Sequence, residues 1–193
     1  MAQPGDKIRE TARQTAGPYV HIGCLPRLAG LPSIYQEDLG QSPISDAANG
    51  QEITITGSIF DGAGATVRDA MVESWQADAN GAYPGQPGVD AGVSGFCRFA
   101  TDLDTGAYAL HTIKPGAAGG QAPHIALWIV ARGLNNGLST RIYFPEDDHA
   151  TEPVLTRIDQ QRARTLIAEK TGDATYRFDI RLQGDGETVF LDM

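Results

Sequence analysis

The sequence predicts an all-β protein, an immunoglobulin-like β-sandwich of about eight strands with an N-terminal extension and one short helix. Three observations predict this class. Short segments with a two-residue apolar period recur after residue 50, turns rich in glycine, aspartate and proline separate them, and a single segment carries helix signals. A short strand cannot bury its apolar face alone, so we expect two sheets that pack face to face.

The chain of 193 residues is long enough for one domain with a substantial core. We divide it into an N-terminal arm, residues 1–50, and a sandwich domain, residues 51–193, because the first 50 residues show no sustained period. The formal net charge of −9, spread without a basic stripe, argues against nucleic acid and anionic membranes as partners. Cys24 and Cys97 cannot build a disulfide framework, and the sequence shows neither a signal peptide nor a run of ~20 apolar residues, so we expect a cytoplasmic protein.

The arm carries few regular signals. Its Gly17-Pro18 step predicts a loop that leads into a strand, and residues 32–38 favour a short helix at most. We expect Trp75, in the second strand of the sandwich, to lie in the core. The predicted strands, in chain order, are 53–60, 70–76, 96–101, 107–112, 125–131, 139–144, 164–168 and 176–182, followed by a return strand at 187–191.

One helix is predicted after the sixth strand. Thr151 is a suitable N-cap, Glu152 suits the positive end of a helix, and Pro153 suits its first turn. Residues 154–158 place their apolar side chains on one face. The sequence therefore predicts a short helix that begins at about residue 151.

The stretch TGAYALHTIKPGAAGGQAPHIALWIVAR organises the chain. Tyr108, Leu110 and Thr112 alternate with smaller or polar residues, which predicts a half-buried strand, and TIKPG ends it. After a glycine-rich loop, residues 125–131 form a nearly continuous apolar run, which predicts a strand buried on both faces. His124 stands at the entrance of that strand, where a histidine is ordinarily a satisfied strand-end residue.

Several segments resemble the intradiol ring-cleaving dioxygenases, and the resemblance covers nearly the whole chain. The segments are TAGPYVHIG, WQADANGAY, TIKPG, APHI, TRIYF and the C-terminal YRFDIRLQGDGETVFLD. The first and last resemble the non-ferric (alpha) chain of members built from two kinds of chain. The resemblance implies a beta subunit of the same fold as partner, a higher-order assembly of alpha-beta pairs, and cleavage of protocatechuate by O2 to 3-carboxy-cis,cis-muconate in the beta-ketoadipate pathway.

The resemblance also indicates which iron ligands this chain retains. An intradiol site needs two tyrosines and two histidines around Fe(III), a hard cation that favours phenolate and accepts imidazole. Tyr83 and His124 match the first tyrosine and the first histidine. Ala118, or a neighbour in its loop, and Ala126 stand at the other two positions, and Gln121 replaces a substrate-facing arginine. Because methyl groups cannot ligate, the resemblance implies that the beta subunit binds the Fe(III) and that this chain binds no metal.

The same resemblance places part of a substrate pocket on this chain. It implies that Thr15, Gly17, Pro18, Tyr19 and Arg132 line the pocket wall, that Tyr19 and Arg132 contribute to catalysis there, and that the arm packs on the partner chain. A tyrosine hydroxyl and a guanidinium suit a substrate with one carboxylate and two hydroxyls. Without the resemblance, Arg132 would be interpreted as a strand-end surface charge and Tyr19 as a packed aromatic.

Two alternatives stay open on the sequence. The first is a self-sufficient intradiol enzyme in which other side chains, such as Tyr108 or His111, converge on iron. The second is a non-enzymatic β-sandwich that serves as a binding module. A co-purifying chain with the intact set of two tyrosines and two histidines would separate these three hypotheses.

Overall fold

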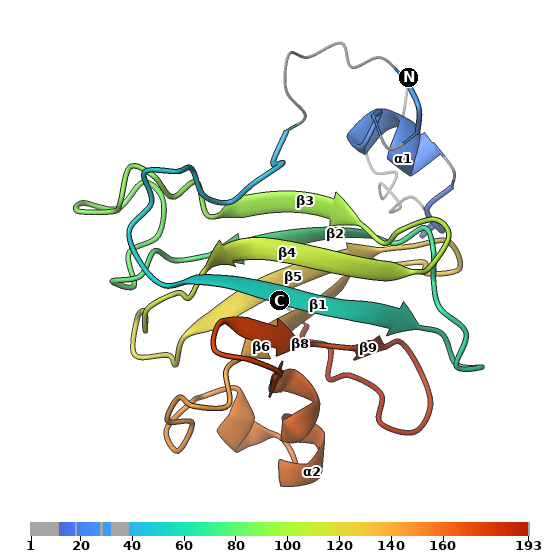
Figure 1. Cartoon of the computed structure of the whole chain (residues 1–193). Helices are drawn as coiled ribbons and strands as arrows, with labels where there is room; N and C mark the ends of the chain where they lie inside the picture. Colours follow the sequence, from blue (N-terminus) through green and yellow to red (C-terminus); the bar gives the residue numbers. More distant parts are fainter. Residues whose placement is uncertain (1–11, 18, 28, 32–38, 193) are drawn as a thin grey trace, which may run out of the picture.

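The computed structural model describes residues 12–17, 19–27, 29–31 and 39–192. These residues form two packed sheets, which confirm the predicted β-sandwich (Figure 1). One sheet has the strand order β4-β1-β8-β7, with β9 also paired to β1, and the other has the order β3-β2-β5-β6. The short helix expected around residues 32–38 lies outside the described part of the chain.

The described residues contain nine strands, two short α-helices and two 3₁₀ turns. In chain order these are α1 (Tyr19–Cys24), β1 (Glu52–Phe60), β2 (Met71–Gln76), β3 (Phe96–Ala100), β4 (Ala107–Ile113), β5 (His124–Val130), β6 (Leu138–Tyr143), η1 (Leu155–Arg157), α2 (Gln160–Ala163), η2 (Arg164–Leu166), β7 (Glu169–Lys170), β8 (Thr175–Arg177) and β9 (Ile180–Arg181).

Each sheet is built around one central strand. In the first sheet, β1 pairs antiparallel with β4 and parallel with β8, so that Ile55 lies between Leu110 and Tyr176. In the second sheet, β5 pairs antiparallel with both β2 and β6. The strands predicted at 53–60, 70–76, 96–101, 107–112 and 139–144 agree with β1, β2, β3, β4 and β6 to within one or two residues.

The core lies between the sheets and uses alternate residues of the central strands. Its largest members include Ile53, Ile55, Ile59, Tyr108, Leu110, Ile125, Leu127, Ile129, Ile142, Phe144, Tyr176 and Phe178. This burial follows the two-residue period of a strand with one face turned inward. A second, smaller cluster joins Tyr143 of β6 to Leu155, Ala163, Leu166 and Val189 under the C-terminal turns.

Two predictions about the second sheet are wrong. Strand β5 is buried on one face only, since Trp128 is 41% exposed and Ala126 is half-buried. Trp75 is 40% exposed and does not lie in the core; its register partner on β5 is Ala126. Register partners share a face of a sheet, so Trp75 and Ala126 lie on the outer face together with Trp128. Nothing among the described residues covers this face as the first sheet covers the inner one.

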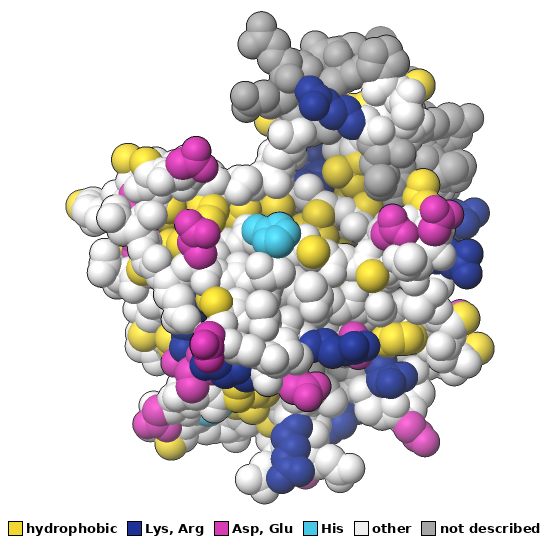
Figure 2. Space-filling view, viewed as in Figure 1, with side chains coloured by type: hydrophobic (Ala, Val, Ile, Leu, Met, Phe, Trp, Pro, Cys, Tyr) yellow, Lys and Arg dark blue, Asp and Glu magenta, His cyan; other side chains and the backbone are white. Residues whose placement is uncertain are grey.

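The outer face of the first sheet has a different character. Figure 2 views this side of the molecule and shows few charged side chains at its centre. The exposed and half-buried positions of β1 and β4 there carry small or uncharged side chains, among them Thr54, Thr56, Ser58, Ala109 and His111. The hydroxyl of Thr54 lies 3.0 Å from Nδ1 of His111.

Two helix predictions need correction. The Gly17-Pro18 step is followed by helix α1, and the expected strand does not form there. Proline suits the start of a helix as well as an extended segment, so the step does not decide between them. In the second case, the segment predicted as a helix from residue 151 contains only the 3₁₀ turn Leu155–Arg157. The helix that does form is α2, and Asp159 caps it by accepting hydrogen bonds from the backbone of Gln161 and Arg162.

The C-terminal strands are shorter than predicted. Residues 164–168 form a 3₁₀ turn and a single bridge from Ile167 to Tyr143, so the strand expected there is wrong. The strand expected at 176–182 is divided into β8 and β9. The predicted return strand at 187–191 donates one backbone hydrogen bond to Arg181 and then crosses to Ser139 of the other sheet. Contacts of these segments with both sheets replace the regular hairpin.

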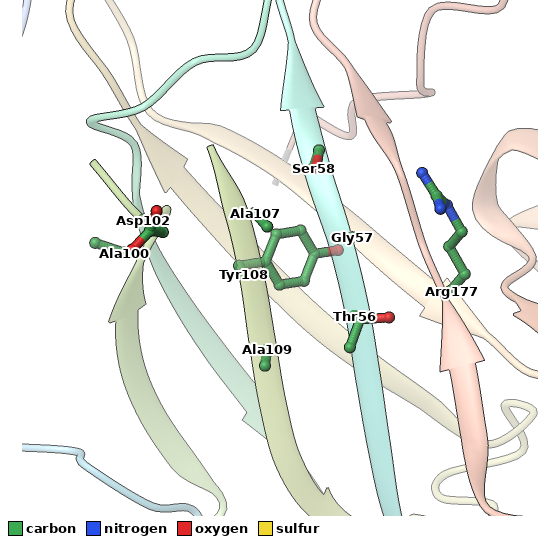
Figure 3. A pocket seen from close by; sticks show the side chains of 9 residues that line it. All are labelled: Thr56, Gly57, Ser58, Ala100, Asp102, Ala107, Tyr108, Ala109 and Arg177. Carbon is green, nitrogen blue, oxygen red and sulfur yellow. The ribbon is translucent and has the colours of Figure 1, made fainter. Parts of the chain in front are cut away.

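Tyr108 and Gly57 form a close contact in the first sheet. The two residues are register partners on β4 and β1, and the Tyr108 ring lies beside Gly57 (Figure 3). The Tyr108 hydroxyl donates a hydrogen bond to the carbonyl oxygen of Phe178. A side chain on Gly57 would overlap that carbonyl and would come within 2.8 Å of the Tyr108 hydroxyl oxygen. Burial, and the charge of Asp179 in second place, raise the pKa of Tyr108 well above its usual range, so the phenol stays a donor.

We expect Gly57→Ala to destabilise the protein by at least about 2 kcal/mol, because the overlapping atoms belong to the backbone and cannot move aside. Urea denaturation measures this loss as a lower midpoint. Gly23→Ala is the matched control, since a Cβ at Gly23 meets no atom within 4 Å and the site is helical. Equal midpoints for the two variants would contradict the proposed overlap.

Candidate functional site

The structure brings together the two retained ligand positions, Tyr83 and His124. The Tyr83 hydroxyl lies 3.5 Å from Nε2 of His124, and the Tyr83 ring stacks on Trp75 with the ring centroids 6.1 Å apart. His124 is the first residue of β5 and is 5% exposed. Ala126, two residues further along β5, points to the same side of the sheet. We call Tyr83, Ala118, His124 and Ala126 the remnant site.

The hydrogen bonds of His124 determine its tautomer. Nδ1 lies 2.8 Å from the carbonyl oxygen of Ala122, and because a carbonyl can only accept, Nδ1 carries the proton. The lone pair of Nε2 therefore faces the Tyr83 hydroxyl. Burial lowers the pKa of His124, against the opposite effect of the bond to Ala122, so the imidazole is neutral at pH 7. This is the form of histidine that ligates metals.

Backbone contacts hold the loop that carries Tyr83. The buried carboxylate of Asp78 accepts hydrogen bonds of 2.9 Å from the backbone N–H groups of Asn80, Ala82 and Asp90. The Asp78 carbonyl also accepts from Gly116, which ties this loop to the turn after β4. The approach of the two loops is tight, because a Cβ at Gly81, where φ is +85°, would overlap the carbonyl of Ala117. Hydrogen bonds within the protein therefore position the loop that carries Tyr83.

A cation that the sequence reasoning missed lies beside the remnant site. Arg141 of β6 is the register partner of Ala126, so the two side chains share a face of the sheet. Its Nη1 atom donates to Oε1 of Gln121 at 3.1 Å and to the Tyr143 hydroxyl at 3.3 Å, and it lies 4.0 Å from Oε1 of Glu152. Only the register of β5 and β6 reveals this placement, since Arg141 is 15 residues from Ala126 in the sequence.

The carboxylate that faces Arg141 is fully buried and well bonded. Glu152 accepts hydrogen bonds from the backbone N–H of Ala122 at 2.7 Å, the Tyr143 hydroxyl at 3.0 Å and the backbone N–H of Val154 at 3.1 Å. These donors stabilise a charged carboxylate in the interior. Burial raises the pKa of Tyr143 to about 12, so its hydroxyl remains a donor to Glu152. Glu152, predicted to begin a helix, instead anchors this cluster.

The residues present do not fit ferric iron. The remnant site offers one phenol, one imidazole and two methyl groups, and a guanidinium stands beside them. Burial raises the pKa of Tyr83, partly offset by the charge of Arg141, so phenolate is disfavoured. Within the described residues, no three His, Cys, Asp or Glu side chains gather closely enough to hold a metal ion.

The alternative ligands considered for a self-sufficient enzyme do not converge. Tyr108 points into the core, where it bonds to Phe178, whereas His111 lies on the exposed face of the same strand. Residues at positions i and i+3 of a strand point to opposite faces. Tyr108 and His111 therefore cannot share an ion.

The predicted pocket wall lies at the far end of β5. The Thr15 hydroxyl accepts a hydrogen bond of 2.7 Å from the backbone N–H of Gly133, which brings the arm beside Arg132. Arg132 forms an ion pair with Asp69, and its side chain is 66% exposed. The carbonyl of Gly17 accepts from Val20 in the first turn of α1. Pro18 and the side chain of Tyr19 lie outside what the structure describes.

The two groups of residues are too far apart to form one site. Arg132 follows His124 by eight residues along β5 and its extension, and at about 3.3 Å per residue the two lie ~26 Å apart. Figure 1 shows α1 at one end of the sandwich. Thr15 and Arg132 therefore cannot act on a ligand held at Tyr83 and His124 of the same chain.

Known proteins resemble this chain along nearly its whole length. A family model described as Dioxygenase matches residues 33–184. The protocatechuate 3,4-dioxygenase alpha chain of Pseudomonas putida is 46% identical over 98% of this chain and 99% of its own length. The protocatechuate 3,4-dioxygenase beta chain of Burkholderia cepacia is 33% identical over 72% of this chain and 67% of its own length. An intradiol ring-cleavage dioxygenase from Tetranychus urticae, at 19% identity over 78% of this chain and 89% of its own, shares the fold with a TM-score of 0.60. Among the described residues, no helix is long and apolar enough to span a bilayer.

An ion-pair network holds the TIKPG turn at the edge of the remnant site. Lys114 contacts Oε1 of Glu146 at 3.0 Å and Oδ1 of Asp147 at 2.9 Å, and the Tyr176 hydroxyl donates to Glu146 at 2.5 Å. Partial burial raises the pKa of Glu146, but the bonds from Tyr176 and Lys114 outweigh it and lower the value to about 2. The charged form of Glu146 therefore stabilises the fold.

We expect the stabilisation of the fold by charged Glu146 to be complete above pH 4.5, the ordinary pKa of a glutamate. It should disappear as the pH falls from 4.5 towards 2. Glu146→Gln should lower stability at pH 7 and make the loss of stability in acid shallower. Urea midpoints between pH 7 and pH 3 measure both effects. Glu187→Gln, in an exposed pair with Arg162, is the control, and the same pH profile for both variants would rule out the role of Glu146.

Proposed function

The chain belongs to the intradiol dioxygenase family, and from this premise we propose that it is the alpha subunit of a protocatechuate 3,4-dioxygenase. The observation that carries the proposal is the identity with the Pseudomonas putida alpha chain over nearly the full length of both chains. The presence of Ala126 in place of a second histidine supports a role without iron. The likeness to a beta chain supports a partner of the same fold.

In this proposal the beta subunit binds the Fe(III), which supplies the oxygen chemistry. The assembled enzyme cleaves the ring of protocatechuate between its two hydroxylated carbons and adds both atoms of O2, which gives 3-carboxy-cis,cis-muconate. This reaction would place the protein in the beta-ketoadipate pathway of aromatic catabolism, in the cytoplasm. Cys24 and Cys97 are unpaired, which suits a reducing compartment.

The arm, residues 1–50, contributes the pocket wall in this proposal. The Thr15 hydroxyl bonds to the backbone of Gly133, next to Arg132, and the resemblance adds Gly17, Pro18 and Tyr19 to the same wall. The guanidinium of Arg132 is exposed and oriented by Asp69, and can offer charge-assisted hydrogen bonds to a substrate carboxylate. Because these residues lie ~26 Å from the remnant site of their own chain, they act on a substrate held by the partner.

The outer face of the second sheet is the surface that we propose for contact between subunits. Trp75 and Trp128 flank a groove of about 270 Å³ that Phe96, Ala126 and Ser139 also line. Large exposed aromatic side chains are enriched in the buried centres of protein interfaces. Ala126 belongs to both the remnant site and this groove. A subunit bound at the groove would therefore also shield the remnant site from solvent.

The metal content of the assembly tests the proposal. We expect the chain purified alone to contain no iron and to be colourless, and its complex with the beta subunit to contain one iron per alpha-beta pair. Phenolate bound to Fe(III) absorbs visible light, so absorption spectra and elemental analysis give independent readings. Iron in the isolated chain, or two irons per pair, would refute the division of roles between the subunits.

We expect Tyr19→Phe and Arg132→Gln to reduce kcat/KM in the assembled enzyme and to leave its iron content and size unchanged. Loss of one hydrogen bond in a pocket shielded from water costs about 1–3 kcal/mol, or roughly five- to a hundredfold in kcat/KM. Arg177→Gln is the matched control, because Arg177 also pairs with an aspartate, Asp179, but lies on the other sheet. Unchanged kcat/KM in both test variants would leave this chain a scaffold.

A further inference from the structure

We propose that the guanidinium of Arg141 takes the place of the metal ion in the remnant site, and that this cation, beyond the loss of two ligands, excludes metals from this chain. The inference rests on family membership, which defines where a metal would bind, and not on the identity of the substrate or the partner. Its failure would leave the proposed function intact.

The register of β5 and β6 brings Arg141 to the remnant site. Ala126 stands where the resemblance expects a histidine, and Arg141 lies directly across from it on β6. Because alanine is smaller than histidine, position 126 leaves room on this face of the sheet. Arg141 on the neighbouring strand supplies a long side chain beside it. Arg141 is 14% exposed, so its charge is largely withdrawn from water.

The hydrogen bonds of Arg141 hold its guanidinium at the edge of the remnant site. Its Nη1 atom bonds to Gln121, at the end of the loop that carries Ala118, and to Tyr143, whose ring lies 5.7 Å from that of His124. The guanidinium therefore lies beside the loop that ends at Gln121 and beside Tyr143, the neighbour of the His124 imidazole.

The positive charge of Arg141 balances the buried carboxylate of Glu152. The carboxylate of Glu152 is fully buried, 4.0 Å from Nη1 of Arg141, and needs a cation nearby. Nε of Arg141 is buried without a hydrogen-bond partner, so two hydrogen bonds and the attraction of Glu152 hold the group. A second cation, such as a divalent metal, would be repelled at this short distance in a medium of low dielectric constant.

The test compares three variants of the full-length chain, Ala126→His, Arg141→Gln, and the two combined. Titration with Co²⁺, followed by its visible absorption and by the gain in melting temperature, measures metal affinity. If the chain purifies only with its partner, cobalt is counted beyond that taken up by the wild-type complex. Glutamine removes the charge and keeps a polar side chain at this position.

We expect Ala126→His alone to bind Co²⁺ no more tightly than wild type, and the combined variant to bind it at least about 100-fold more tightly. Arg141→Gln alone should gain about tenfold, from Tyr83, His124 and Glu152, and it tests the proposal even if Ala126→His fails to fold. Ala126→His combined with Arg177→Gln is the matched control for net charge and should bind as weakly as Ala126→His. Tight binding by Ala126→His alone, or equal affinity of the wild type and Arg141→Gln, would overturn the proposal.

Discussion

Strand β5 is the constraint on which the rest of this structure depends. It is hydrogen-bonded along both edges, to β2 and to β6, and it places Ile125, Leu127 and Ile129 in the core. Bending β5 would break its backbone hydrogen bonds to both neighbouring strands and would expose apolar surface. Its extended geometry therefore keeps His124 at one end and Arg132 at the other, ~26 Å apart. The pocket wall predicted at Arg132 therefore cannot form one site with Tyr83 and His124 of the same chain.

The loops around the remnant site are held in place by contacts within the protein. The loop that carries Tyr83 is organised by Asp78 through backbone hydrogen bonds, and Lys114 ties the next turn to Glu146 and Asp147. These contacts are made by residues that ligate no metal. Protein contacts therefore hold the loops, and the Tyr83 ring stacks on Trp75.

Buried charge explains why this region is more than a site with ligands missing. Glu152 is satisfied by three donors and faces Arg141, so the cluster is close to neutral. A buried pair of this kind is costly to break on one side, because the partner would be left as an unpaired charge in the interior. The same pair draws Glu152 inward, and the segment after it begins with a 3₁₀ turn in place of the helix that its sequence favours.

The sequence alone predicted the sandwich and the alternation of β1 and β4, because these depend on local period and turn residues. The family resemblance singled out Tyr83 and His124, and the structure brings the Tyr83 hydroxyl to 3.5 Å from Nε2 of His124. The resemblance also grouped Thr15 with Arg132; the hydrogen bond from Gly133 to Thr15 has no local signal in the sequence. Only the tertiary structure decided that Trp75 and Trp128 face outward, since a strand pattern does not reveal which face another sheet covers. Only the register between β5 and β6 brought Arg141 to Ala126, because contacts across a sheet depend on strand alignment and not on separation along the chain.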